Sequence, residues 1–304
     1  MKRFGKLLVG WDNHFPIRTA DLSYVHEEYE RLQKSGKRLV LGTLPSRSGT
    51  KWLCDIFEAH ENGTGRPEPH YDAAAFYRWV TYNKLSVDTS GVMAVFKHGI
   101  IEQWKRKDIA LVFSPHFSHG LIELYRELKP EKIIFAINDP KFTVQSMYNF
   151  GFFTQAYIHV DTEKALGYQP ALDGAWPHTF GRLVPTGPFY REWENLTRVG
   201  KLAWWGSMVT QDIHRQLSEL PPEVTDIFNL KVADQNYSWY LELAKRYRLT
   251  PMLSESDFLA LKSIRYKKSD NVEHIWSLQE QAEFDRYTRD WEALYENLCS
   301  KESA

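Results

Sequence analysis

The chain has 304 residues, 43% of them hydrophobic, which is enough for one large α/β domain with its own core. Its 38 lysines and arginines nearly balance 39 aspartates and glutamates, so the chain has no overall field that would attract nucleic acid or a membrane. Two cysteines argue against a disulfide framework, and the N-terminus has no apolar signal region. We therefore expect a single cytoplasmic domain over residues 1–304 that binds neither nucleic acid nor a membrane.

The first strand and helix of the chain surround a polar turn. Residues 1–36 carry no chemistry that we can identify, and we interpret them as an N-terminal extension. The apolar run at residues 39–41 predicts a buried strand, and the spacing of Leu53, Ile56 and Phe57 predicts a helix. The turn between them contains proline, serine and glycine, which favour tight backbone geometry.

This turn has the properties of an anion site. The start of a helix offers free N–H groups and the positive end of a dipole, and here Arg47 and Lys51 lie beside it. The nucleotide-triphosphate loop requires Gly-Lys-Ser/Thr after a first glycine and four residues. In this chain Thr50 precedes Lys51, and the cation Arg47 comes before Gly49, so that motif is broken.

Strands and helices alternate through the rest of the chain. Residues 60–72 predict a loop, because glycine and proline dominate there. Apolar runs predict strands at residues 92–96, 109–113, 132–137 and 226–232. Helical spacing predicts helices at residues 76–85, 100–107, 121–128, 201–220, 238–246 and 284–298. This order predicts an α/β protein with a mostly parallel sheet, and residues 151–200 predict an irregular lid or acceptor wall.

The turn resembles a known donor loop. Its residues fit Arg/Lys-Ser-Gly-Thr-x-Trp, the loop with which sulfotransferases bind 3′-phosphoadenosine 5′-phosphosulfate (PAPS), with Ser46 as one extra residue before the cation. The resemblance covers residues 38–150 well and residues 200–298 loosely. It implies a P-loop-like three-layer α/β/α fold. It also implies that the donor is held by Arg47, Ser48, Gly49, Thr50, Lys51 and Trp52.

The segment after residues 132–137 resembles a second element of that family. The run from Asn138 to Ser146 is similar to Arg-Asp-Pro-Arg-Asp-Val-x-x-Ser, in which the opening Arg and closing Ser hold the 3′-phosphate. Ser146 keeps its place, but Asn138 replaces the Arg. An amide donates a hydrogen bond without neutralising a phosphate, so Lys141 or a remote cation would supply the charge.

A third element lies near the end of the chain. Phe258 matches a family phenylalanine that packs on adenine, which implies that Trp52 and Phe258 sandwich this base. A cationic run before Trp276 resembles the family segment that grips the 3′-phosphate, although its glycine is missing. The residues of this run that the resemblance places on the phosphate are Arg265, Lys267 and Lys268.

Sulfuryl transfer needs a charge for the leaving oxygen and a base for the acceptor. Arg47 occupies the position of the family's catalytic cation and would stabilise the leaving oxygen. Histidine suits the base because its ordinary pKa is about 6.5. His116 follows the strand at residues 109–113 and keeps the family's spacing to Asn138, so it is our first choice. The alternatives are His119, His98 and His70.

These features predict an enzyme that moves the sulfuryl group of PAPS to a hydroxyl or amino group of a small molecule, without a metal, releasing PAP. One alternative is a P-loop small-molecule kinase, which the broken motif disfavours. Another is an inactive PAP- or nucleotide-binding protein, which Asn138 favours. The acceptor, the choice between a sulfate ester and a sulfamate, and the choice between monomer and homodimer stay open.

Overall fold

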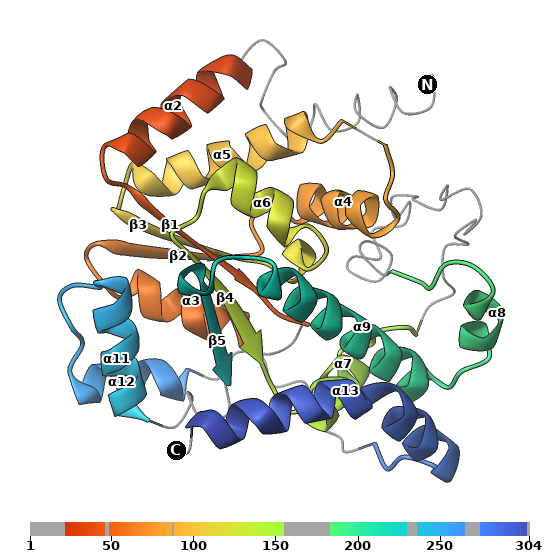
Figure 1. The fold of residues 1–304 in the computed structure, drawn as a ribbon. Coiled ribbons are helices and arrows are strands. Elements are labelled where there is room, and N and C mark those ends of the chain that lie inside the picture. Colours follow the sequence, from red (N-terminus) through yellow and green to blue (C-terminus); the bar gives the residue numbers. More distant parts are fainter. Residues whose placement is uncertain are drawn as a thin grey trace.

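A five-stranded sheet forms the centre of the computed structural model, which describes residues 22–45, 49–86, 88–154, 183–229, 236–264 and 274–302 (Figure 1). The strand order is β2-β3-β1-β4-β5, and every neighbouring pair is parallel. The strands are β1 (Arg38–Thr43), β2 (Gly63–Pro67), β3 (Ile109–Phe113), β4 (Lys132–Ile137) and β5 (Thr225–Asn229). The predicted α/β class with a mostly parallel sheet is confirmed.

Helices cover both faces of the sheet and complete the three predicted layers (Figure 1). One face is covered by α3 (Thr50–Glu58), α11 (Tyr237–Tyr247) and α12 (Glu255–Ser263). The other face is covered by α2 (Leu22–Lys34), α4 (Tyr71–Tyr82), α5 (Ser90–Trp104), α6 (Leu121–Leu128), α7 (Pro140–Asn149), α9 (Arg198–Ser218) and α13 (Leu278–Glu302). The short helices are η2 (Pro115–Phe117), α8 (Phe189–Glu194) and η3 (Pro222–Val224).

The two helical layers are held by alternating residues of the strands. In β1, Leu39 and Leu41 belong to the core beneath the larger helical layer, whereas Val40 between them packs with α3 and α11. Successive strand residues point to opposite faces, so a strand covered on both sides must be apolar throughout. This explains why β1, β3 and β4 are continuous apolar runs that the sequence made easy to predict.

Most predicted elements are confirmed with small shifts of their ends. The strands predicted at residues 39–41, 109–113 and 132–137 are β1, β3 and β4. The strand predicted at residues 226–232 is β5, although residues 230–232 lie outside the described residues. Within the predicted N-terminal extension, α2 packs on the core, where the Tyr29 hydroxyl donates to the carbonyl of Leu128 at 2.6 Å.

The strand predicted at residues 92–96 is wrong, because these residues belong to α5, which runs without interruption from Ser90 to Trp104. The helix is buried on most of its circumference, so its apolar residues form a nearly continuous run rather than a stripe. A short apolar run cannot distinguish a buried helix from a buried strand. The helix predicted at residues 100–107 is the end of the same element, which stops at Trp104.

The loop predicted at residues 60–72 contains the edge strand β2, which the sequence analysis missed. Its glycines allow α3 to approach the strand closely. A Cβ at Gly65 would lie 2.2 Å from the carbonyl oxygen of Cys54, and one at Gly63 would lie 2.6 Å from that of Phe57. Pro67 ends the strand at the edge of the sheet, where proline is tolerated. The glycines here allow close packing and the proline ends a strand, so a composition that is typical of loops was misleading.

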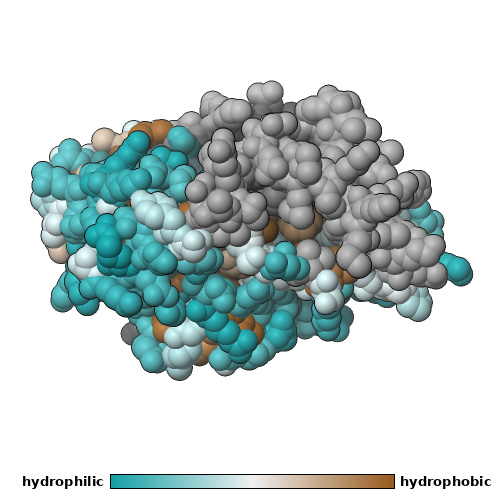
Figure 2. Space-filling model, turned by 90° about the horizontal axis from the view of Figure 1, so that it is seen from above, coloured by the Kyte–Doolittle hydropathy of each residue, from teal (hydrophilic) through white to brown (hydrophobic). Residues whose placement is uncertain are grey.

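The described surface seen from above is mostly hydrophilic, with small hydrophobic areas between polar ones (Figure 2). Large exposed hydrophobic side chains include Ile275 and Leu278, next to the start of α13. Among the described helices, none combines the length and the apolar character needed to cross a bilayer.

Candidate functional site

The carboxyl ends of β1, β3 and β4 meet at one edge of the sheet. Gly42 of β1 lies opposite Phe113 of β3, and Thr43 of β1 lies opposite Phe135 of β4. The chain leaves β1 toward β2 on one side and leaves β4 toward β5 on the other. Parallel sheets bind ligands in the crevice that such diverging connections create. The predicted donor loop after β1 and the predicted phosphate segment after β4 therefore lie on neighbouring strands.

The turn after β1 leads into a helix start that suits an anion. Gly49 has φ of +91°, a left-handed conformation that favours glycine, and it is the residue before α3. Within the described part of the chain, no side chain caps this helix. The first-turn N–H groups at Thr50, Lys51 and Trp52 therefore point out of the helix end without a side-chain acceptor at the cap. The predicted donor ligands Arg47 and Ser48, and Ser46 before them, lie outside the described residues.

The side chains of α3 divide between solvent and core. The Lys51 side chain is mainly exposed, and its Nζ lies 3.9 Å from the Asp55 carboxylate one turn later. Trp52 is buried and stacks on Trp239, with ring centroids 5.7 Å apart and planes 19° apart. Its indole Nε1 has no hydrogen-bond partner among the described residues. Trp52 thus anchors the helix start in the core beneath the turn.

The adenine sandwich expected between Trp52 and Phe258 stays a prediction, and the structure shows how the two rings lie against each other. The two rings touch directly, with centroids 6.2 Å apart and planes inclined at 62°. Phe258 is fully buried, and it stacks on Tyr240 with centroids 5.0 Å apart. A flat base between two rings needs parallel faces separated by twice the stacking distance, so adenine could enter here only if the rings moved apart. Both side chains are part of the core that carries α12 and α3.

The segment after β4 forms the start of α7. The Asp139 side chain caps this helix by accepting from the N–H of Phe142 at 2.8 Å, and Pro140 occupies its first turn. The amide oxygen of Asn138 accepts from the N–H of Asp139 at 2.8 Å, so the amide nitrogen is the group that remains to meet an anion. Ser146 is half-buried two turns into the helix.

The cations predicted near the 3′-phosphate are only partly placed. Lys141 is exposed, and its Nζ lies 5.4 Å from the centre of the Trp276 ring. The cationic run at Arg265, Lys267 and Lys268 lies outside the described residues. The described segments therefore bring Lys141 to the tryptophan that follows this run. Which cation would neutralise a phosphate bound at Asn138 stays a prediction.

His116 lies directly after β3 in η2 and is buried, with 3% of its surface exposed. Its backbone N–H donates to the Ser114 hydroxyl at 3.2 Å, and the N–H of Ser114 donates to the carbonyl of Gly42 at 2.9 Å. The Tyr71 ring meets the His116 ring edge-on, with centroids 4.5 Å apart. This places His116 beside the end of β1, with an aromatic ring against it.

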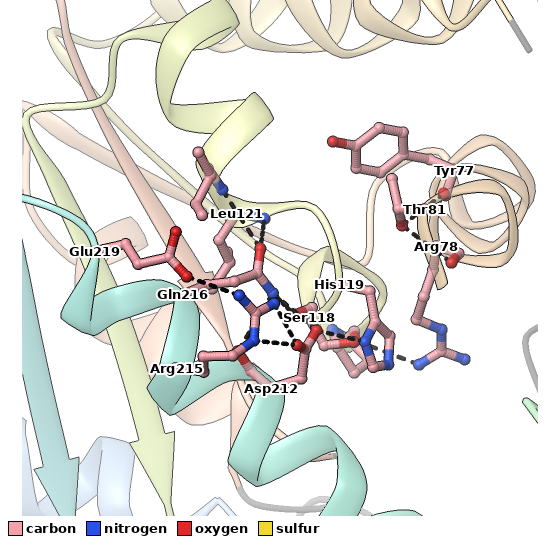
Figure 3. A network of polar contacts seen from close by, with 12 residues as sticks. Tyr77, Arg78, Thr81, Ser118, His119, Leu121, Asp212, Arg215, Gln216 and Glu219 are labelled. Atoms are coloured by element: carbon pink, nitrogen blue, oxygen red, sulfur yellow. Dashed lines mark hydrogen bonds and ion pairs between the residues drawn. The ribbon is translucent and has the colours of Figure 1, made fainter. Parts of the chain in front are cut away.

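His119 is held by a carboxylate that the sequence analysis did not identify. Its Nδ1 lies 2.6 Å from the Oδ2 of Asp212 on α9, and its side chain is almost completely buried (Figure 3). Burial lowers the pKa of His119, and the Asp212 carboxylate opposes that shift. The residues are far apart in sequence, so no local spacing could have revealed the pair. The only local signal is the polar series Asp212, Arg215 and Gln216 on one side of α9.

The other two candidate bases are His70, before α4, and His98, within α5. His70 precedes α4, and burial lowers its pKa to about 4, with His98 and Arg66 contributing. A Cβ at Gly99 would lie 2.4 Å from the Nε2 of His70, so the ring is pressed against α5. His98 is half-buried on α5. No three His, Cys, Asp or Glu side chains gather as a metal site would require in the described ranges.

Comparison with known proteins finds similarity among solved structures. No family model and no curated protein matches the chain. Among solved structures, the chain is similar to a sulfotransferase domain from the curacin biosynthetic pathway. The identity is 13%, the match covers 82% of this chain and 96% of that chain, and the TM-score is 0.43. The fold class itself follows from the sheet order and register described above.

Proposed function

We propose that this chain is a sulfotransferase that moves the sulfuryl group of PAPS to a hydroxyl or amino group of a small molecule. The observation that carries the proposal is the corner between β1 and α3. It combines the residue order from Arg47 to Trp52 with a left-handed Gly49, an α3 start that no described side chain caps, and a place where strand connections diverge.

The proposed chemistry relies on position and charge. The N–H groups at the start of α3 would bind the phosphosulfate, and Arg47 would stabilise the bridging oxygen as it leaves with the electron pair of its bond to sulfur. The amide nitrogen of Asn138 and the hydroxyl of Ser146 would contact the 3′-phosphate from the neighbouring strand end. A histidine after β3 would accept the proton of the incoming hydroxyl or amine.

Radiolabelled PAPS tests this proposal directly. The full chain is incubated with ³⁵S-PAPS and a panel of phenols, alcohols and amines, and labelled products are separated from the donor. PAP binding is measured in parallel by calorimetry. We expect PAP binding and label transfer to at least one acceptor class. Phosphate transfer from ATP that requires Mg²⁺ would favour the kinase instead, and PAP binding without any labelled product would favour the inactive binding protein.

A further inference from the structure

The loop after β3 carries a histidine whose tautomer is set by its surroundings. The Nδ1 of His119 faces the Oδ2 of Asp212 at 2.6 Å (Figure 3). An ionised carboxylate can only accept, so Nδ1 carries the proton in this contact. In the neutral ring Nε2 is then a bare acceptor. A carboxylate that fixes a histidine in this way also stabilises the imidazolium formed when Nε2 takes up a proton.

Both members of the pair are fixed by further contacts. Gln216 donates to the carbonyl of Ser118 at 2.6 Å and to the Oδ2 of Asp212 at 2.9 Å, and its oxygen accepts from the N–H of Leu121 at 2.7 Å. Arg215 donates to the other carboxylate oxygen of Asp212 at 2.6 Å. The loop and the carboxylate are therefore attached to one helix, α9, which restricts both partners to one geometry.

The remaining nitrogen of His119, Nε2, is buried. Nε2 is shielded from solvent and has no hydrogen-bond partner in the part of the chain that the structure describes. A buried acceptor left unsatisfied costs about 1–3 kcal/mol, so such a group needs an explanation other than stability. The Tyr82 ring meets the His119 ring edge-on, with centroids 5.2 Å apart. Arg78 of α4 also lies near His119 (Figure 3).

We infer that His119, oriented by Asp212, is the general base that accepts the proton of the acceptor substrate, an inference that rests on the proposed sulfotransferase function. In this step the proton of the acceptor's hydroxyl or amine moves to Nε2, and a lone pair of the acceptor's oxygen or nitrogen forms the new bond to sulfur. The bond between sulfur and the bridging oxygen breaks, and its electron pair stays with PAP. The imidazolium beside Asp212 later returns its proton to water.

The electrostatic surroundings agree with a base that is neutral before the reaction. Burial lowers the pKa of His119 most strongly, and the cations Arg78 on α4 and Arg215 on α9 lower it further. The Asp212 carboxylate on α9 raises it, and Tyr82 on α4 faces the ring. Because the pKa of His119 is lowered from 6.5, the ring is mainly neutral at pH 7, with its one proton on Nδ1 and with Nε2 as the acceptor that a base requires. The pH profile of kcat/KM should fall only on the acidic side.

Chemical rescue separates this role from a structural one. The full-length variants His119→Ala and His119→Gln are assayed for label transfer from ³⁵S-PAPS, for PAP affinity by calorimetry and for melting temperature. We expect kcat to fall by about 10²–10⁴-fold with PAP affinity within about twofold of the unmutated chain. Added imidazole should restore part of the activity of His119→Ala and none of that of His119→Gln. His214→Ala, at an exposed position of the same helix, is the matched control and should behave as the unmutated chain.

Two outcomes overturn the inference while leaving the proposed function intact. One is turnover close to normal in both His119 variants, with the loss appearing instead in His116→Ala. The other is a loss in the His119 variants that imidazole does not reverse and that tracks a weaker PAP affinity or a lower melting temperature. Failure of the proposed function has a different signature, because the unmutated chain itself would then transfer no label, whether or not it binds PAP.

Discussion

The two halves of the proposed site are built in different ways. The donor corner is continuous in sequence, since β1, the turn and α3 follow one another directly. The His119–Asp212 pair joins residues 93 positions apart, and it forms because α9 crosses the loop after β3. A continuous corner leaves its mark as a short motif. A contact between distant segments leaves none, so the residue order allows the donor corner to be proposed but gives no sign of the His119–Asp212 pair.

The largest effect should come from breaking the donor corner. Arg47→Ala removes the permanent cation that the motif places beside the leaving oxygen, and cations in this role are worth roughly 10³-fold or more in phosphoryl transfer. We expect label transfer to fall at least that far and PAPS to bind more weakly. Arg31→Ala, an exposed residue of α2 paired with Glu28, is the control and should leave both unchanged. Normal kinetics in Arg47→Ala would remove this corner from the site.

The second half can be tested through its charges. Asp212→Asn removes the carboxylate that raises the pKa of His119, so the acidic limb of the kcat/KM profile should move to lower pH while kcat falls by about 10–100-fold. Arg215→Ala removes a cation that lowers this pKa, and the limb should move to higher pH. Opposite shifts would identify His119 as the titrating group. An unmoved limb in both variants would assign the limb to another group.

The same contrast explains which parts of the fold were predictable. The buried strands β1, β3 and β4 were predicted because each is a short apolar run bounded by polar residues. The helix α5 was misread because burial on most sides erased the helical period. The edge strand β2 was missed because Gly63 and Gly65 are needed for the close approach of α3, and this contact cannot be read from the local sequence.

The candidate site divides in the same manner. The predicted helix start after Gly49 is present, and Asn138 and Ser146 follow β4 on the neighbouring strand, whereas donor binding by these residues stays a prediction. The adenine sandwich stays a prediction, because a motif specifies that Trp52 and Phe258 are aromatic and does not specify the angle between their rings, which touch directly in the structure. The histidines could be enumerated from the sequence, but their ranking needed the partner of each ring, which comes from helices elsewhere in the chain.

Acid sensitivity of the fold must be separated from acid sensitivity of the reaction, and His70 provides the means. Its pKa is lowered to about 4, so the unfolded chain binds a proton more readily than the folded one. Its contribution to stability is complete above pH 6.5 and is lost as the pH falls toward 4. Between pH 7 and pH 5, the free energy of unfolding should therefore fall by about 1–2 kcal/mol less in His70→Gln than in the unmutated chain.

Urea unfolding at pH 7 and pH 5 measures this difference. If His70→Gln reduces the difference in unfolding free energy between pH 7 and pH 5 and leaves the acidic limb of kcat/KM unmoved, the limb reports a group that titrates in the reaction. A limb that moves with His70→Gln would instead reflect acid unfolding, and the charge test of His119 would then have to be repeated in this variant.

The smallest effect should distinguish glycine as a turn former from glycine as part of a ligand site. Gly49 and Gly36 share the left-handed conformation, with φ of +91° and +94°, and a Cβ at Gly36 would meet nothing within 4 Å. Alanine should cost about 1–2 kcal/mol of unfolding free energy at either position, because the same backbone strain is introduced. Gly36 lies before β1, at the opposite end of the strand from the proposed donor loop.

Only Gly49→Ala should therefore weaken PAP binding, by about tenfold if the turn shifts the first N–H groups of α3 away from the phosphate. Calorimetric titration of both variants with PAP, at a temperature where both are folded, makes the comparison. Equal PAP affinities in the two variants would mean that the backbone at Gly49 shapes the turn without reaching the ligand, and the donor corner would then depend on its side chains alone.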